Sequence, residues 1–73
     1  MHYKLKDMIE ENKWYPFGGD IKIPEEPPEE MIILKLKSGG ICRFSNPQPF
    51  EIVVEWMVIS EDVNYIITEY EQR

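Results

Sequence analysis

The fold is decided by the stretch Met31-Ile32-Ile33-Leu34-Lys35-Leu36-Lys37-Ser38-Gly39-Gly40-Ile41-Cys42-Arg43-Phe44. Apolar side chains at Ile32, Leu34 and Leu36 alternate with other residues, and this period of two is typical of a strand. Ser38-Gly39-Gly40 predicts a tight turn, and the residues 41–44 predict a return strand. The stretch therefore predicts a β-hairpin.

A third strand is predicted over residues 51–59, which are rich in β-branched and aromatic residues. Trp56 and Val58 fall on one face of this strand, and Met57 and Ile59 fall on the other. Because both faces are apolar, both need a cover. Either the sheet curls into a compact, barrel-like shape, or a second copy or a partner covers one face. We favour self-association, so the chain is a possible homo-oligomer.

Two more strands are predicted on either side of these elements. Ser60-Glu61-Asp62 predicts a turn, and the alternation that follows predicts a last strand over residues 63–70. Nearer the N-terminus, Ile21-Lys22-Ile23 alternates and predicts a short strand. These segments would enlarge the antiparallel sheet that the hairpin begins.

Residues 1–13 are predicted to form a short helix. Leu5, Met8 and Ile9 have the spacing i, i+3, i+4, which places them in one apolar stripe. A strand through Tyr3 and Leu5 is the alternative. The expected fold class is α+β, with a short N-terminal helix and a small, curled antiparallel β-sheet of about four strands.

The length and charge of the chain limit its function. Its 73 residues predict a single small domain, 1–73, and 42% of them are hydrophobic, which favours a folded globule. The formal net charge of −6 opposes direct binding to nucleic acid or to an anionic membrane surface. The same charge permits a basic protein partner. We therefore expect no direct contact with nucleic acid or membrane.

The cysteine count indicates the compartment. Cys42 is the only cysteine, so neither an intrachain disulfide nor a cysteine-based zinc site can form within one chain. A domain this small without a disulfide framework predicts a reducing compartment, the cytoplasm. No apolar run is long enough to span a membrane.

The candidate binding segment is Trp14-Tyr15-Pro16-Phe17-Gly18-Gly19-Asp20. Three aromatic residues surround one proline, and the two glycines can take φ > 0 or let a ligand approach the backbone. One interpretation is that the aromatic rings plug the end of a small core. The other is that they stack on a planar, nucleotide-like ligand whose phosphate meets the amides of Gly18 and Gly19 and is neutralised by Lys22, Lys35, Lys37 or Arg43. The candidate ligand-binding residues are Trp14, Tyr15, Phe17, Gly18, Gly19, Asp20, Trp56 and Arg43.

A second candidate segment is Pro24-Glu25-Glu26-Pro27-Pro28-Glu29-Glu30. Prolines remove backbone donors and like charges repel, so an extended surface loop is expected. It is either a solvated connector or an acidic strip that docks on a basic partner. The candidate partner-binding residues are Glu25, Glu26, Glu29 and Glu30.

Catalysis is not predicted. His2 lies at the N-terminus, and Cys42 lies inside a predicted strand, where a small core residue is expected. Asp20 beside the glycines is typical of a turn. The acidic run lacks the spacing of a calcium-binding loop. We expect no catalytic residue, no metal site and no cofactor.

The order of these signals resembles that of small uncharacterised accessory proteins of tailed bacteriophages and prophages. The shared features are Trp14, Gly18-Gly19, the Gly-ended hairpin strand 34–40, Trp56 and a closing apolar segment with Tyr70. The resemblance implies a phage origin and an accessory role against host defence. Here the gap between Gly-Gly and Pro24 holds residues 20–23, longer than in that pattern.

These observations predict a non-enzymatic binding protein. It is expected to counter host defence by sequestering a small nucleotide-like ligand in the aromatic and Gly-Gly segment. The alternative is an acidic inhibitor that docks on a host defence enzyme or a nucleic-acid-binding enzyme. If the protein is phage-encoded, its site of action is the host cytoplasm.

Overall fold

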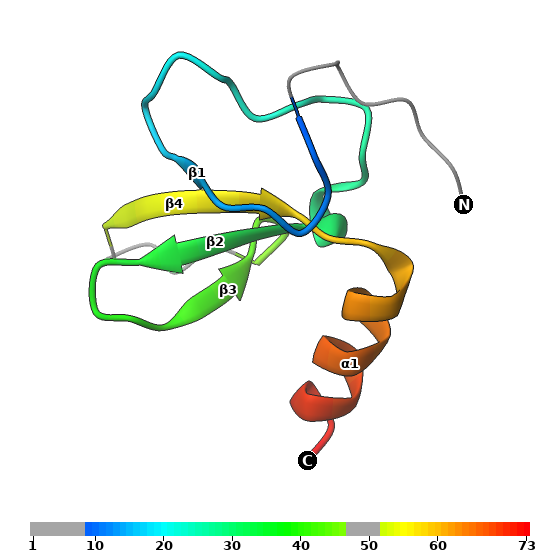
Figure 1. The fold of residues 1–73 in the computed structure, drawn as a ribbon. Coiled ribbons are helices and arrows are strands. Elements are labelled where there is room, and N and C mark those ends of the chain that lie inside the picture. The colour runs from blue at the N-terminus through cyan, green and yellow to red at the C-terminus, as the bar shows by residue number, and fades with distance from the viewer. Residues whose placement is uncertain (1–8, 47–51) are drawn as a thin grey trace.

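The computed structural model describes residues 9–46 and 52–73. The chain runs through the elements β1 (Tyr15–Pro16), the 3-10 helix η1 (Glu29–Met31), β2 (Ile32–Leu36), β3 (Ile41–Arg43), β4 (Val53–Val58) and α1 (Glu61–Glu71). The four strands form one antiparallel sheet in the order β1-β4-β2-β3 (Figure 1). The two shortest strands, β1 and β3, are therefore its edges.

The predicted hairpin is confirmed. Leu34 of β2 lies opposite Cys42 of β3, and the turn closes with hydrogen bonds between Leu36 and Gly40 and between Gly39 and Leu36. Gly39 has φ of 99°, in the left-handed region where glycine carries no steric penalty. The Gly-Gly pair in the sequence thus supplies the conformation that reverses the chain.

The strand predicted over residues 51–59 is confirmed as β4, which pairs with β2 on one side and with β1 on the other. Residue 51 lies outside the described residues. The register shifts between Lys35 and Leu36 of β2, which face Glu55 and Val53 respectively. Val54 is therefore an extra residue in β4, a β-bulge, and 38% of it is exposed.

The last predicted strand is wrong, because residues 61–71 form the helix α1. The Ser60 hydroxyl accepts a hydrogen bond from the Val63 amide and caps the helix, and two acidic residues follow in its first turn, where the helix dipole favours negative charge. Val63 and Ile67 are one helical turn apart and pack toward the sheet, whereas Tyr70 is exposed. The alternation over residues 63–70 also contains this helical period.

The predicted N-terminal helix is also wrong, since the one α-helix among the described residues is C-terminal. Residues 1–8 lie outside the described residues. Residues 9–13 contain a turn and no helix, because Asn12 has φ of 61° and its amide donates to the Val58 carbonyl. The strand predicted at Ile21-Lys22-Ile23 is not formed; this segment is irregular and packs two isoleucines on the core.

The sheet has two faces with different covers, one on each side of it (Figure 1). On the loop face, the irregular chain on either side of β1, within residues 9–28, covers an apolar cluster. On the helix face, α1 covers a smaller cluster. The buried members of the loop-face cluster are Ile9, Tyr15, Ile32, Leu34, Trp56 and Val58, and those of the helix-face cluster are Met31, Ile33 and Ile59. One chain thus covers both sides of its own sheet.

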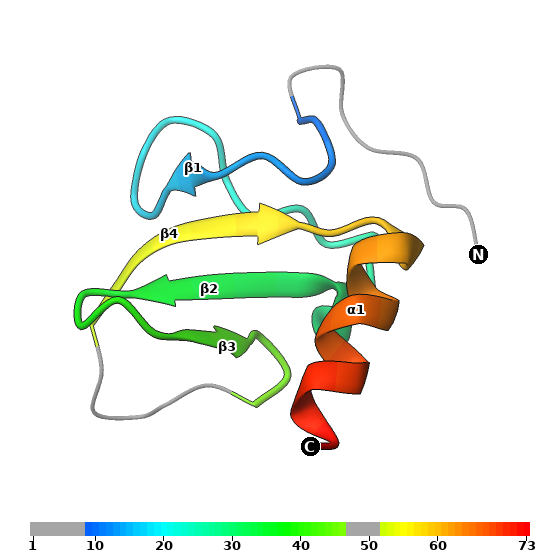
Figure 2. The same cartoon turned by 60° about the horizontal axis from the view of Figure 1, so that its bottom comes forward.

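Helix α1 crosses the sheet near one end, where β2 begins and β3 and β4 end (Figure 2). The Ile59 amide donates to the Met31 carbonyl, which holds the start of α1 beside η1. No helix in the described part of the chain is long and apolar enough to cross a membrane.

Candidate functional site

Two of the predicted ligand-binding aromatics form the centre of the loop-face core. Tyr15 and Trp56 lie directly opposite each other in β1 and β4, and their rings stack with centroids 5.0 Å apart and planes at 27°. Trp56 is 1% exposed and Tyr15 is 5% exposed. The Tyr15 hydroxyl accepts a hydrogen bond from the Glu10 amide at 2.8 Å. Each of these two rings stacks on the other.

Trp14 lies apart from these two rings. As the neighbour of Tyr15 it belongs to the opposite face, where it is half-buried and packs on the helix-face cluster. The Lys35 ammonium nitrogen lies 5.1 Å from the centroid of its ring, within cation–π distance. The same nitrogen lies 3.4 Å from a Glu55 carboxylate oxygen. The predicted wall of three aromatics is thus divided between two faces.

The remaining residues of the candidate binding segment, 17–20, form a turn at the surface. Phe17 is 53% exposed, and its amide donates to the Val54 carbonyl. Gly18 has φ of 83°, with open space where a side chain would begin. A Cβ on Gly19 would lie 3.0 Å from the Pro16 ring. Asp20 is exposed.

A small cavity of about 230 Å³, here called the Phe17 cavity, lies beside this turn. It is lined by Phe17, Gly18, Ile21, Lys22, Ile23 and Trp56. Three predicted ligand-binding residues, Phe17, Gly18 and Trp56, therefore meet there, together with Lys22, one of the four cations predicted to neutralise a phosphate.

Arg43 lies elsewhere, under α1, where its side chain is 13% exposed. The Nε atom donates to the Glu71 carboxylate, Nη1 donates to the Glu30 carbonyl at 2.6 Å and to Asn64 Oδ1 at 2.8 Å, and Nη2 donates to Thr68 Oγ1 and to Glu71 Oε1. A guanidinium has five N–H donors, one on Nε and two on each Nη atom. The hydrogen bonds above give each of these donors an acceptor within the chain. Arg43 ties α1 to β3 and η1 and has no donor left for a ligand.

The acidic segment lies between two hollows. On one side is a cavity of about 270 Å³, here called the loop cavity, lined by Ile23, Pro24, Glu25, Pro27, Glu29, Ile32 and Phe44. On the other is a larger one of about 440 Å³, here called the α1 groove, lined by Pro28, Glu30, Met31, Glu61, Asn64, Tyr65 and Thr68. Glutamates line both hollows.

The local sequence explains how the α1 groove forms. Pro28 is extended, with φ of −57° and ψ of 144°, and its carbonyl accepts from the Met31 amide to close the turn of η1. On the opposite wall, Glu61, Asn64 and Thr68 have helical spacing and share one side of α1. The two walls meet at Arg43, which binds both.

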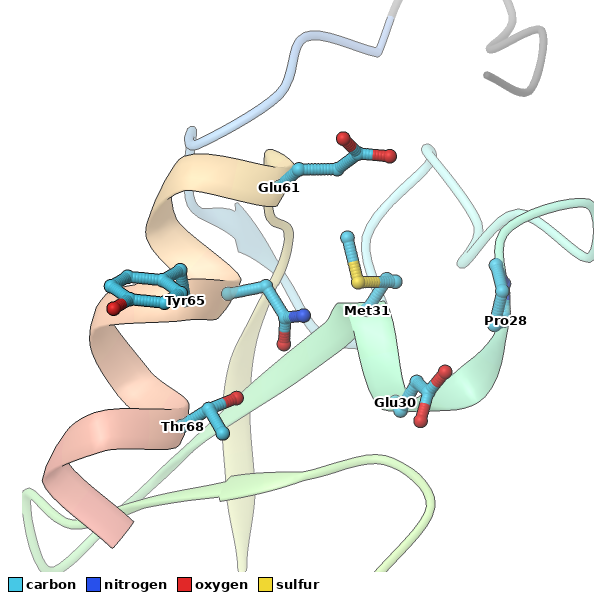
Figure 3. Close-up of a pocket in the computed structure, with 7 residues that line it drawn as sticks. Pro28, Glu30, Met31, Glu61, Tyr65 and Thr68 are labelled. Atoms are coloured by element: carbon cyan, nitrogen blue, oxygen red, sulfur yellow. The ribbon is translucent and has the colours of Figure 1, made fainter. Parts of the chain in front are cut away.

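Figure 3 shows a close-up of the α1 groove with its lining residues drawn as sticks. Glu61 and Thr68 extend from α1, and Pro28, Glu30 and Met31 come from the facing segment. The Tyr65 ring points away from Met31, and its hydroxyl donates to a Glu69 carboxylate oxygen at 2.9 Å. Pro28 and Met31 give the groove an apolar floor, and the two glutamates that line it, Glu30 and Glu61, come from its two walls.

Among the described residues, the buried side chains are aliphatic, aromatic or methionine, and no charged side chain is buried. Within residues 9–46 and 52–73, no three His, Cys, Asp or Glu side chains lie close enough to hold a metal ion. Cys42 has a free, half-buried thiol in β3.

The sequence did not predict the α1 wall of the groove, because residues 63–70 were predicted as a strand. Asn64 and Thr68, which line this wall, were not among the candidate site residues. The signal that identifies them is the N-cap Ser60 followed by two acidic residues, which marks a helix start.

Comparison of the chain with protein-family models, curated proteins and solved structures gave no match.

Proposed function

We propose that this chain is a non-enzymatic binding protein that docks on a basic surface of a partner protein. The observation that carries the proposal is the position of the acidic segment between the loop cavity and the α1 groove. Carboxylates around these hollows steer a basic partner, and the apolar floors provide contact area once it has arrived.

The size of the α1 groove supports this choice. Its volume of about 440 Å³ lies within the range of about 300–1,000 Å³ that is typical of ligand sites. The loop cavity, with about 270 Å³, is slightly below the lower end of this range. Both are open enough for side chains of another protein. The net charge of −6 adds a long-range attraction toward a basic surface.

Sequestration of a small nucleotide-like ligand is the second candidate, and the Phe17 cavity favours it. Lys22 lines this cavity and supplies a positive charge, and Gly18 leaves the backbone open. Against it, the volume of about 230 Å³ is below the typical range, and Trp56 is stacked on Tyr15. We therefore place it behind docking.

The phage-type accessory role against host defence fits either candidate, and we retain it as a proposal. A basic groove on a nucleic-acid-binding host enzyme would match the acidic surface in charge. We propose the cytoplasm as the compartment. Cys42 is the only cysteine, so the chain forms no intrachain disulfide, and a small domain without disulfides is typical of a reducing compartment.

The test is a pair of charge-neutralised variants. One is E25Q/E29Q/E30Q on the acidic segment, and the matched control is E10Q/E11Q/D20N on exposed residues of the segment 9–28 outside both hollows. Each removes three negative charges from −6, so both have a net charge of −3. A partner captured by the wild type is purified, and its affinity for each protein is measured by calorimetry at two salt concentrations.

We expect the acidic-segment variant to lose at least about tenfold in affinity, and the control to retain wild-type affinity apart from a weaker salt dependence. Equal losses would reduce the interaction to net charge and contradict the proposal. Native mass spectrometry of the purified protein tests the second candidate. A retained nucleotide-sized mass that disappears in a Lys22→Ala variant would place sequestration first, and the same spectrum gives the number of copies.

A further inference from the structure

We propose that the outward face of α1 is a docking surface for a basic amphipathic helix of the partner protein. This outer α1 face consists of Asp62, Tyr65, Ile66, Glu69 and Tyr70. The inference deepens the proposed function and rests on it, because it names the kind of element on the partner that docks. Three features carry it: an exposed apolar stripe, the carboxylates beside the stripe and the regular backbone beneath it.

The apolar stripe is formed by three large side chains of α1. The exposed fractions are 65% for Tyr65, 65% for Ile66 and 74% for Tyr70. Along α1, pairs of exposed residues alternate with pairs of half-buried ones, so these three side chains lie on the side away from the sheet, whereas Val63 and Ile67 pack toward it. Tyrosine is among the residues that most often anchor protein interfaces. The stripe therefore offers contact area that the chain itself leaves uncovered.

The charge of the outer α1 face favours a basic occupant. Asp62 and Glu69 are exposed and lie two helical turns apart, so they share one line along this face. Glu69 accepts a hydrogen bond from the Tyr65 hydroxyl at 2.9 Å, and because this donor is neutral, the carboxylate keeps its negative charge. The sequence of α1 contains no lysine or arginine. Basic side chains that border the apolar stripe of a partner helix are therefore attracted to this face.

A second copy of the chain fits this face less well. It would bring the same two carboxylates to the contact, and each copy has a formal net charge of −6. Like charges oppose the association of the two copies, whereas they favour a basic partner.

The backbone beneath the stripe favours a helical partner over an extended one. The N–H and C=O groups inside α1 bond to one another, so an extended segment cannot be added there by strand pairing. Side chains on a helix form ridges, and a second helix packs its own ridges into the grooves between them. The 11 residues of α1 have a length of about 16 Å, which accommodates about three turns of a partner helix.

The outer α1 face is continuous with the acidic surface of the proposed function. Tyr65 belongs to this face and also lines the α1 groove, whose opposite wall includes Pro28 and Glu30 of the acidic segment. In Figure 3 the Tyr65 ring extends from α1 on the side away from Met31. A basic partner attracted by the acidic segment therefore has apolar contact area at the neighbouring helix.

The probe is a synthetic peptide of two repeats of Leu-Lys-Lys-Leu-Leu-Lys-Leu, whose leucines share one face of a helix. Two counterparts each change one property. Glutamate in place of lysine reverses the charge, and two repeats of Leu-Lys-Leu-Lys-Leu-Lys-Leu keep the composition but have the period of a strand. Each peptide is titrated into the full 73-residue chain at fixed ionic strength while amide NMR shifts are followed. We expect saturable shifts centred on Ile66, Glu69 and Tyr70 with the helix-period lysine peptide alone.

A single substitution on the stripe has a matched control. Ile66→Gln removes the central apolar side chain of the outer α1 face. Ile41→Gln is the control, because Ile41 is 53% exposed and lies beside the β2–β3 turn, at the end of the sheet opposite α1 (Figure 2). We expect the affinity for the lysine peptide to decrease about tenfold in I66Q and to stay unchanged in I41Q. The amide spectrum of each variant shows whether it is folded.

A second pair of variants tests the charge separately from the apolar contact. Asp62→Asn removes a carboxylate from the outer α1 face, and Asp20→Asn removes an equal, exposed charge from the turn after β1. We expect the affinity for the lysine peptide to decrease about threefold in D62N and to stay unchanged in D20N.

The outcomes separate this inference from the proposed function. Equal weakening by I66Q and I41Q, equal binding of either counterpart peptide, or no saturable shift on the outer α1 face would overturn the helix-docking surface. Shifts of the same amides when the protein alone is concentrated would assign the face to a second copy and would overturn it as well. In each of those cases the calorimetry with E25Q/E29Q/E30Q still decides whether the acidic segment docks on a partner.

Discussion

The loop face and the helix face of the same sheet differ in what holds their covers in place. On the loop face the contact is apolar and aromatic, and its centre is the stacked pair Tyr15 and Trp56. On the helix face a smaller apolar cluster is joined to a polar clamp, in which Arg43 reaches α1 and η1. The residues of α1 itself are at most half-buried.

This difference separates stability from binding. Burial of large rings is the main source of stability in a small domain, so the loop face should determine whether the chain folds. An isolated helix of 11 residues is marginal in water, so α1 depends on its clamp and its few apolar contacts. The more weakly held cover is also the one that forms a wall of the α1 groove, where a small adjustment would accompany binding.

The largest effect is expected from Trp56→Ala. Loss of a fully buried tryptophan costs about 3–5 kcal/mol, against a total stability of about 4–11 kcal/mol for a chain of this length. Trp14→Ala is the matched variant on the helix face, where the ring is half-buried, and we expect it to cost about 1–2 kcal/mol. Urea denaturation measures both. Equal costs would contradict the assignment of stability to the loop face.

An intermediate effect is expected from Arg43→Met, which keeps an apolar stem and removes every hydrogen bond of the clamp. Part-buried acceptors such as Asn64 lose a charged donor, which costs about 1.5–3 kcal/mol, whereas the ion pair itself adds little because Glu71 is half exposed. Hydrogen exchange should show lost protection in α1 before β2 and β4 lose theirs. Arg43→Lys retains the charge but not the fork, and it should restore only part of the protection.

The sequence predicted the central part of this arrangement. Alternation in β2 and the Gly-Gly turn placed the hairpin, and alternation in β4 placed Trp56 and Val58 on one face, where both are buried. These predictions succeed because the period of a strand fixes which side chains share a face. The bulge at Val54 was not predictable, because it depends on the partner strand.

The helix-face cover could not be placed in the same way. The segment from Val63 to Tyr70 contains apolar residues at both a strand and a helix period, and only the cap at Ser60 distinguishes them. The candidate site depended on that choice. The acidic segment was identified by its composition, but the groove beside it requires Asn64 and Thr68, which a strand would have placed elsewhere.

The smallest effect is expected at the polar link between the two covers. Asn12 leads into β1, and its side chain makes two hydrogen bonds with Ser60. Asn12 Oδ1 accepts from the Ser60 backbone amide at 2.9 Å, and Asn12 Nδ2 donates to Ser60 Oγ at 3.1 Å. Ser60→Ala should cost about 1 kcal/mol, because it removes Oγ and with it the helix cap and the bond from Asn12 Nδ2, whereas the backbone amide of residue 60 still donates to Asn12 Oδ1. Asn12→Gly removes both hydrogen bonds between the two residues and allows the backbone at φ of 61°. In a double-mutant cycle by urea denaturation we expect a coupling of about 0.5–1 kcal/mol, and strict additivity would mean that the two covers are held independently.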